Sequence, residues 1–210
     1  MRDLILAMSM SLDGVVSGPD GDIEWMFSGD QAAKAWKVES VSNASLHIMG
    51  SRTFRTMASY WPTSTDVFAP AMNGIAKAVF SRQGRAILEA ADAKAAIGDR
   101  RAGAGTGEAN TLQPGGESWT EAYVASGDLA EEVTRLKTQE GKPIIAHGGA
   151  SFARSLVAEG LVDQYHLMVH PIALGKGLPL FSDLAAPRAL RLMSSTAFPL
   201  GSVAQVYRPA

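Results

Sequence analysis

Two adjacent glycines, Gly148 and Gly149, stand where the apolar run "KPIIAH" ends and the helical pattern "ASFARSLVAEG" begins. A helix that starts directly after a strand exposes several backbone N–H groups at its positive end. Glycine lets an anion approach that main chain closely because it has no Cβ. The pattern indicates either a phosphate site or an ordinary tight turn, and the spacing alone does not separate the two.

Two further apolar runs end in residues that suit phosphate. In "HIMGSRTF", Gly50 is followed by residues 51–53, and in "VFSRQ" the run ends at Ser81 and Arg82. Hydroxyl and guanidinium groups at a helix start bind phosphate oxygens, although a capped helix with a solvated arginine has the same residues. The carboxyl ends of parallel strands lie side by side along one end of a sheet, so three such junctions predict a dinucleotide bound across these strand ends. No Gly-x-Gly-x-x-Gly follows the first strand, which disfavours the ordinary Rossmann fold.

Asp13 and His147 are the residues best suited to acid–base chemistry. Asp13, in "SLDG", follows the first apolar run and lies on a glycine-rich loop. There its carboxylate either binds a substrate hydroxyl or amine and helps move a proton, or caps the backbone of its own turn. His147 directly precedes Gly148 and is a proton donor or a polar lining residue. His166 and His170 lack the third ligand that a metal site needs, so we expect them to be structural.

The helices and strands that must position these residues are predicted from the periodicity of apolar residues and from the residues that typically begin and end helices. We expect helices over residues 31–42, 51–61, 129–141 and 150–160, the first and third capped by Asp30 and Asp128. We expect strands over residues 4–10, 45–50, 76–81, 119–126, 142–149 and 162–172, and a hairpin over 188–209 that turns at 199–201. Strands and helices alternate as far as residue 160, and strands alone follow. This order predicts an α/β fold with a mostly parallel sheet and an antiparallel end.

Length and composition limit the function classes. The 210 residues fit one domain spanning residues 1–210, with a glycine-rich flexible insertion over about 83–118. The 19 basic and 21 acidic residues nearly cancel, so we expect no nucleic-acid partner. The chain has no cysteine, which excludes disulfides and thiolate metal sites and suits a cytoplasmic location. The first apolar run is too short for a membrane helix and lacks a signal-peptide cleavage pattern, so we expect no membrane association.

The order of these motifs resembles the dihydrofolate reductase superfamily, and within it the branch of the riboflavin-biosynthesis reductase C-terminal domain. The segments that carry the resemblance are "SMSLDGVVSGPDGDIEW", "IMGSRTF", "VFSR", "GDLAEEVTRLK" and "IIAHGGASFARSLVAEGLVDQYHLMVHPIALGKGLPLF". The resemblance implies a three-layer fold with a mixed sheet of about eight strands and helices on both faces. It also implies NADPH as coenzyme and hydride transfer to a small heterocyclic or ribosylamino-pyrimidine-like substrate, as in 5-amino-6-(5-phosphoribosylamino)uracil reductase.

The resemblance assigns roles to individual residues. It implies that residues 50–53 hold coenzyme phosphates, that residues 81–82 face the 2′-phosphate of NADPH, and that residues 148–152 donate backbone N–H groups to the pyrophosphate. In full, the implied coenzyme residues are Val16 (at the nicotinamide ring), Gly50, Ser51, Arg52, Thr53, Ser81, Arg82, Gly148, Gly149, Ala150, Ser151 and Phe152. The implied substrate residues are Asp13, which is also the catalytic candidate, with Trp25, Asp30 and His147. Relatives commonly have a basic residue where this chain has Ser51, which makes the preference for NADPH less secure.

Two other functions remain open at this point. A dihydrofolate reductase needs an acidic side chain on the helix beside the pterin, and Asp30 is the candidate. A nucleotide-binding module of the same fold without catalysis would keep the phosphate junctions alone. The resemblance further implies a homodimer, formed through the C-terminal strands. The zinc deaminase that accompanies the riboflavin reductase in bifunctional proteins is excluded in its usual form, because the chain has no cysteine.

Overall fold

The computed structural model of the chain describes residues 1–27, 29–90 and 111–210. Its centre is an eight-stranded sheet with the strand order β5-β4-β3-β6-β1-β7-β10-β9. The pairings from β5 to β7 are parallel, and β10 runs antiparallel to both β7 and β9. The strands are β1 (Leu4–Ser11), β3 (Leu46–Gly50), β4 (Ala76–Phe80), β5 (Tyr123–Ala125), β6 (Ile144–His147), β7 (Gln164–His170), β9 (Leu190–Ala197) and β10 (Val203–Pro209). The predicted mixed sheet with an antiparallel C-terminal end is confirmed.

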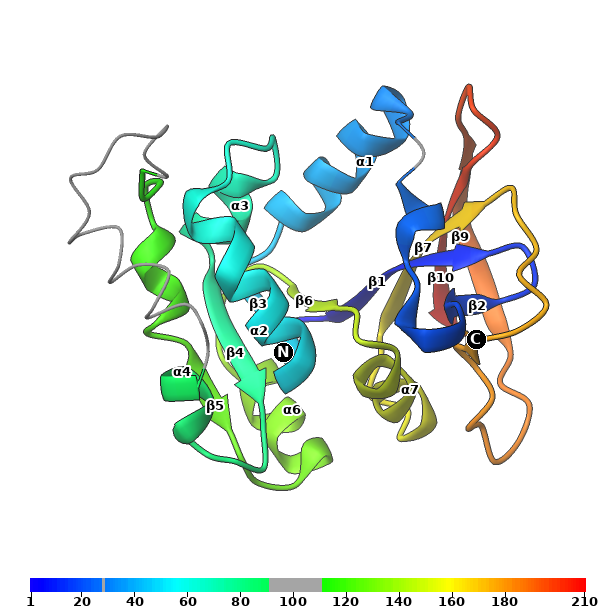
Figure 1. Cartoon of the computed structure of the whole chain (residues 1–210). Coiled ribbons are helices and arrows are strands. Elements are labelled where there is room, and N and C mark those ends of the chain that lie inside the picture. Colours follow the sequence, from blue (N-terminus) through cyan, green and yellow to red (C-terminus); the bar gives the residue numbers. More distant parts are fainter. Residues whose placement is uncertain (28, 91–110) are drawn as a thin grey trace.

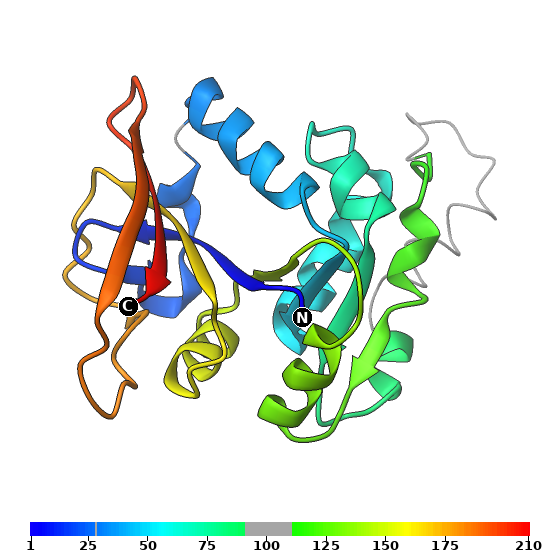
Figure 2. The same cartoon turned by 180° about the vertical axis from the view of Figure 1, so that it is seen from behind.

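Helices cover both faces of this sheet (Figures 1 and 2). They are α1 (Gln31–Ser42), α2 (Ser51–Tyr60), α3 (Ala69–Gly74), α4 (Ala86–Ala90), α6 (Leu129–Lys137) and α7 (Ala150–Ala158). Single 3-10 turns form η1 (Pro19–Gly21), η2 (Glu24–Met26), η3 (Trp61–Thr63) and η4 (Gly116–Trp119). The three layers therefore follow the predicted alternation of strands and helices.

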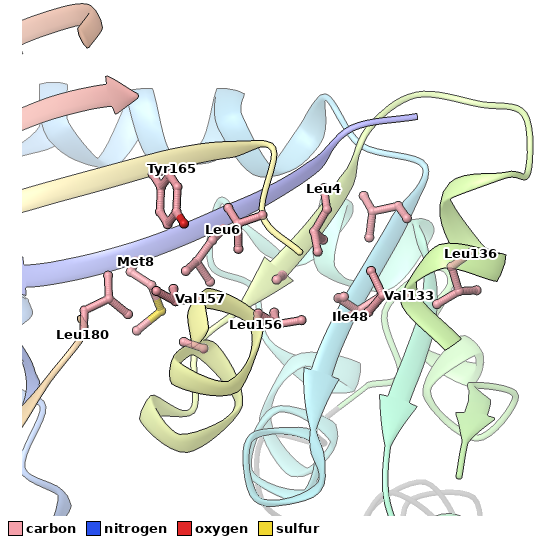
Figure 3. Close-up of a cluster of buried hydrophobic side chains, with 14 of the residues drawn as sticks. Leu4, Leu6, Met8, Ile48, Val133, Leu136, Leu156, Val157, Tyr165 and Leu180 are labelled. Atoms are coloured by element: carbon pink, nitrogen blue, oxygen red, sulfur yellow. The ribbon is translucent and has the colours of Figure 1, made fainter. Parts of the chain in front are cut away.

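Alternate residues of the central strand β1 serve the two faces. Leu4 and Leu6 are fully buried against α6 and α7, together with Leu136 and Leu156 (Figure 3). Ile5 packs in the opposite direction with Val41 of α1 and with the segment that contains α3. A strand buried on both faces must be continuously apolar, which explains the run at the start of the chain. Full burial of each such side chain contributes about 1.5–3 kcal/mol.

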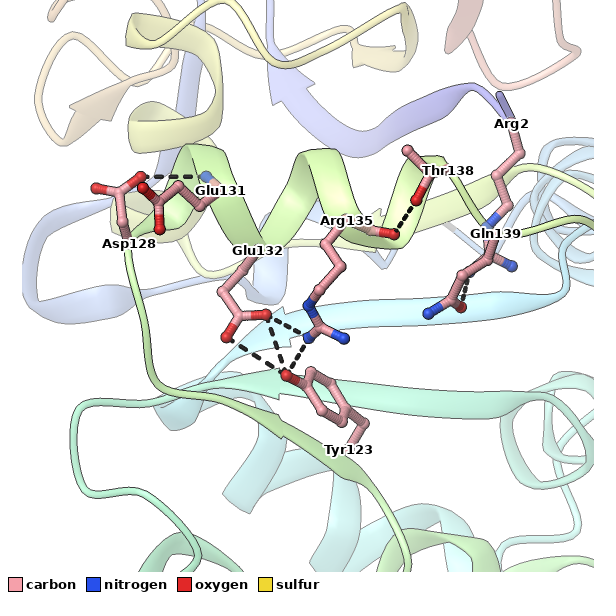
Figure 4. A network of polar contacts seen from close by, with 8 residues as sticks. All are labelled: Arg2, Tyr123, Asp128, Glu131, Glu132, Arg135, Thr138 and Gln139. Atoms are coloured by element: carbon pink, nitrogen blue, oxygen red, sulfur yellow. Dashed lines mark hydrogen bonds and ion pairs between the residues drawn. The ribbon is translucent and has the colours of Figure 1, made fainter.

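Helix starts agree with the sequence prediction because capping is local. Asp30 accepts hydrogen bonds from the backbone of residues 32 and 33, and Asp128 does the same for residues 130 and 131. The C-terminal half of α6 is joined to β5 through Tyr123, whose hydroxyl contacts Glu132 and Arg135 (Figure 4). The helix ends at Lys137, four residues before the predicted end at Gly141, where the backbone has φ +136°.

Four features differ from the sequence prediction. A separate two-stranded sheet pairs β2 (Val15–Ser17) with β8 (Leu178–Pro179), and neither strand was predicted. Helices α3 and α4 were also missed, and strand β5 is three residues long where eight were expected. The N-terminal end of the predicted insertion belongs to the core, since Ile87 is fully buried in one cluster with Trp119, the residue directly after the insertion. Residues 91–110 of that insertion lie outside the described residues.

The chain reverses direction across the sheet between β3 and β6, which are direct neighbours. From β3 the chain passes through α2 to β4 on one side, and from β6 it passes through α7 to β7 on the other. Two crossovers in opposite directions place α2 and α7 on opposite faces, with their N-termini side by side at the strand ends. This is the topological switch point where open α/β sheets bind ligands.

Candidate active site

The N-termini of α2 and α7 have free backbone donors. Helices α1 and α6 are capped by aspartates, whereas α2 and α7 begin at Gly50 and Gly149 with no side-chain cap. The first turns of α2 and α7 also contain no acidic residue, although α6 has Glu131 and Glu132 there. Uncapped N–H groups at two adjacent helix starts form a concentrated positive field at the switch point. The arrangement fits a pyrophosphate, as the sequence pattern indicated.

Gly149 has a structural reason to be glycine besides any ligand. Its backbone has φ +97°, and a Cβ at this position would stand 2.5 Å from Oγ1 of Thr53. The Thr53 hydroxyl donates a hydrogen bond of 2.9 Å to the carbonyl oxygen of Gly148. A Cβ on Gly50 would lie 3.1 Å from Cβ of Phe152, so the second pair of junction residues is also in close contact. The two predicted phosphate segments are thus brought together and tied to each other.

The other residues of these segments differ in exposure. Ser151 is exposed and Ser51 is half-buried, so both border the space at the helix starts. Phe152 stacks at a tilt on Phe80, the last residue of β4, with ring centroids 5.0 Å apart, and Ala150 packs against the same core. Phe152 and Ala150 therefore contribute backbone N–H groups and packing, while the serines offer hydroxyls.

Two arginines near the switch point have no acidic partner within the described residues. Arg52 is exposed in the first turn of α2, where a positive charge opposes the helix dipole. Arg82 is exposed directly after β4, the strand beside β3. Ser81 is 7% exposed, and its Oγ accepts a hydrogen bond of 3.2 Å from the backbone of residue 83, so it shapes the turn that carries Arg82.

Asp13 joins two loops. Its carboxylate accepts hydrogen bonds from the Ser11 hydroxyl at 2.6 Å and from the backbone N–H groups of Leu174 and Gly175 at 3.0 and 2.7 Å. These bonds, the one from Ser11 foremost, lower the pKa of Asp13 to about 2. Near neutral pH the group is a fixed anion that holds the turn after β1 against the loop after β7. It fits the capping alternative, and the predicted catalytic role stays a prediction.

Three further predicted site residues, one for the coenzyme and two for the substrate, lie in separate surroundings. Val16 is 3% exposed and belongs to the core cluster on the α7 face, and its contact with nicotinamide stays a prediction. Asp30 is 5% exposed, caps α1 and accepts a bond of 2.8 Å from the backbone of Leu200, which is the main cause that lowers its pKa. Trp25 lies edge-on to His170 with ring centroids 5.7 Å apart.

His147 is the last residue of β6 and is 7% exposed. Its ring packs edge-on against His47 at 4.5 Å, and its Nε2 has no hydrogen-bond partner among the described residues. Burial, reinforced by the nearby positive charges of His47 and Lys77, holds the pKa of His147 well below its usual range. The imidazole is neutral near pH 7, which fits the polar-lining alternative, and its role at the site stays a prediction.

A polar cluster that the sequence did not reveal lies on the α1 face of the sheet. Lys37 of α1 donates a hydrogen bond of 2.9 Å to Oγ of Ser9 on β1, and Nε2 of His170 is 3.2 Å from the same oxygen. Trp25 covers the histidine ring. Lys37 was missed because helix α1 has apolar and charged residues mixed around its circumference, so the buried side could not be recognised.

One cavity of about 160 Å³ lies elsewhere, on the α7 face, between Tyr165, Phe181, Leu184, Arg188 and Leu190. It contains none of the predicted site residues. Among the described residues, no group of three or more histidine, aspartate or glutamate side chains is arranged to hold a metal ion. Nor does the described part of the chain contain a helix of the length and apolar content that a membrane span requires.

Comparisons with known proteins agree with this architecture. A family model described as the RibD C-terminal domain matches residues 2–204. The uncharacterized protein YyaP of Bacillus subtilis (strain 168) is 25% identical over 211 residues, which cover 98% of this chain and 94% of that protein. A pyrimidine reductase-like protein from Corynebacterium diphtheriae is similar in structure, with TM-score 0.63 and 16% identity over 100% of this chain and 92% of the other. A diaminohydroxyphosphoribosylaminopyrimidine deaminase/5-amino-6-(5-phosphoribosylamino)uracil reductase from Thermotoga maritima has TM-score 0.64 and 15% identity over 100% of this chain and 57% of the other.

Proposed function

The chain belongs to the RibD C-terminal domain family, and from that premise we propose that it is an NADPH-dependent reductase of a small heterocyclic substrate. The substrate class we propose is ribosylamino-pyrimidine-like, as in the reductase activity named for the Thermotoga maritima protein. The resemblance in the sequence and the dihydrofolate-reductase-like architecture agree with this family.

The observation that carries the proposal is the pair of uncapped helix starts at the switch point. Residues 50–53 and 148–152 leave main-chain donors without a side-chain cap on two adjacent helices, and Gly50 and Gly149 let these two helix starts approach each other closely. A pyrophosphate satisfies these donors and both helix dipoles at once. Arg52 and Arg82 add positive charge on the same side, which suits the additional phosphate that distinguishes NADPH from NADH.

Bound coenzyme would supply hydride from the nicotinamide C4 atom to a polarised C=N or C=O carbon. The chain's own contribution is positioning. The junctions hold the phosphates, and the neutral His147 lines the end of β6 beside them. Trp25, on the segment before α1, covers the adjacent end of β7 and limits access of water there.

Folate reduction is less well supported than this proposal. The acid that a folate reductase needs would have to come from α1, and Asp30 has its carboxylate engaged by the helix start and by Leu200. The α1 side chain that reaches β1 beside His170 is Lys37, a cation. A pterin ring would therefore meet a positive charge where its protonated form needs a negative one.

The test is a calorimetric titration with NADPH and with NADH. We expect NADPH to bind more tightly than NADH, and Arg82→Ala to weaken NADPH selectively by about 1.5–3 kcal/mol, the loss of a charged hydrogen bond. Lys142→Ala is the control, because Lys142 is exposed just before β6, at the end of the sheet opposite to the strand ends that carry Arg82. Absence of binding by either coenzyme would refute the proposal.

Turnover separates an enzyme from a binding module. We expect 5-amino-6-(5-phosphoribosylamino)uracil or a related imine to accelerate oxidation of bound NADPH. Tight NADPH binding with no turnover across a panel of imines and carbonyl compounds would favour a non-catalytic nucleotide-binding module of the same fold.

We also propose a homodimer formed through the C-terminal strands. β9 is an edge strand whose residues 191–197 are all exposed, and it presents Leu192 and Met193 with about half of each surface accessible. Unpaired edges with apolar side chains favour pairing with a second chain. Sedimentation analysis tests this, and a monomer at micromolar concentration would contradict it.

A further inference from the structure

Lys37 is a cation held against the sheet without a carboxylate. Its Nζ donates to Ser9 Oγ at 2.9 Å, and the side chain is only partly exposed. Loss of hydration lowers the pKa of Lys37 to about 8, and no acidic group offsets this effect. Lys34, one turn earlier on α1, pairs with Asp66 at 2.8 Å, so the same helix contains a lysine with a partner and one without.

The groups that face Lys37 are neutral or acceptors already in use. Ser9 lies on β1, and His170 and His166 lie on β7, where burial lowers the pKa of both histidines, that of His170 to about 4. His170 has Ser202 beyond its Nδ1 at 3.5 Å, and Trp25 covers its ring. The Ser9 hydroxyl accepts from Lys37 and can donate to neutral His170, which leaves two ammonium protons of Lys37 unassigned.

This cluster lies beside the proposed coenzyme junction. His147 pairs with Ala7 of β1, and Ser9 is two residues further along the same strand. Residues two apart on a strand point to the same face about 7 Å apart, so Ser9 follows His147 on the α1 face of the sheet. Lys37 therefore reaches the carboxyl end of β1, next to the strand that ends in Gly148 and Gly149.

We propose that Lys37 and Ser9 form the subsite for an ionised oxygen of the substrate, an enolate or a carboxylate. This inference rests on the proposed reductase function and concerns one group of its substrate: a singly charged oxygen on the pyrimidine, not the ribose phosphate. A monoanion would accept hydrogen bonds from the two remaining N–H groups of the Lys37 ammonium and would neutralise its positive charge. A phosphate dianion would need further cations, and Lys37 is the one cation of this cluster in the described parts of the chain.

The experiment uses three pyrimidines with different charge. Barbiturate presents an enolate oxygen and orotate a carboxylate, and both are monoanions at neutral pH, whereas uracil is uncharged. Each is titrated calorimetrically into the full chain, with and without saturating NADP⁺. The variants are Lys37→Met, Lys37→Arg and, as control on the same helix, Lys34→Met, each checked for folding by its urea midpoint.

We expect the wild type to bind at least one monoanion ten or more times tighter than uracil. Lys37→Met should abolish this preference, Lys37→Arg should retain part of it, and Lys34→Met should leave it unchanged. Equal binding of all three pyrimidines, no binding of either anion, or an undiminished preference in Lys37→Met would each overturn the inference.

The NADPH titration distinguishes failure of this inference from failure of the proposed function. If the protein binds NADPH but does not prefer a monoanion over uracil, the proposed subsite is refuted and the reductase function is not. If the protein prefers a monoanion through Lys37 but does not bind NADPH, the reductase function is refuted and the subsite is supported.

Discussion

Replacement of Ser51 by aspartate should affect folding and coenzyme binding in opposite directions. Ser51 is the first residue of α2, a helix start with no side-chain cap and no acid in its first turn. A carboxylate there satisfies the helix dipole in place of a ligand. We expect Ser51→Asp to stabilise the protein by about 0.3–1 kcal/mol, the usual gain for an acid at a helix N-terminus.

The same carboxylate should repel a pyrophosphate. Two negative charges about 6 Å from one carboxylate cost about 1.4 kcal/mol at the dielectric constant of water, which is about tenfold in Kd. The protein surface around the helix start reduces the effective dielectric constant, so tenfold is the lower limit. High salt should reduce the effect, because the Debye length falls to about 3 Å at 1 M.

The assay combines urea unfolding with NADPH calorimetry at low and high salt. Ser51→Asn is the matched control, since it has the shape of aspartate without its charge and should change affinity little. Ser151→Asp repeats the test at the start of α7, where the wild-type serine is exposed.

Unchanged NADPH affinity in both aspartate variants would show that the helix starts do not face the pyrophosphate. An equal loss in Ser51→Asn and Ser51→Asp would show that shape and not charge is responsible. Either result would refute the electrostatic reasoning.

Three other substitutions test the structure independently of a ligand. Gly149→Ala should destabilise the protein by about 1–3 kcal/mol more than Gly14→Ala, because both backbones have positive φ but only at Gly149 does a Cβ collide, with Thr53, as urea midpoints will show. Lys37→Met should stabilise the protein by about 1–2 kcal/mol below pH 8, because the lowered pKa of about 8 shows that folding disfavours the protonated lysine. This gain in stability should disappear as the pH rises toward 10.5, where the lysine is neutral in both the folded and the unfolded state. An equal stability difference between variant and wild type at pH 7 and pH 10.5 would contradict the burial of the charge. Stability should fall as the pH drops below about 6.5, because His147 binds a proton in the unfolded chain but, with its lowered pKa, stays neutral in the folded protein. His147→Asn should make the unfolding free energy less dependent on pH between 6.5 and 4.5.

Local signals were sufficient for much of the fold. The caps at Asp30 and Asp128, the glycine that ends β3 and the glycines that follow β6 act within a few residues, so their effect does not depend on distant parts of the chain. The continuous apolar run of β1 indicated burial on both faces, which is the mark of a central parallel strand. The short pairing of β2 with β8 left no such pattern, because it joins residues about 160 positions apart through two residue pairs.

The sequence by itself determined the order of strands and helices along the chain, the two helix starts at Gly50 and Gly149 and the family. Tertiary structure alone decided what the side chains contact. Asp13 accepts from Leu174 and Gly175, more than 160 positions away, which makes it a loop anchor in the fold. Lys37 acquires its low pKa only when α1 lies on β1, since desolvation depends on what covers a charge and not on its neighbours in the chain.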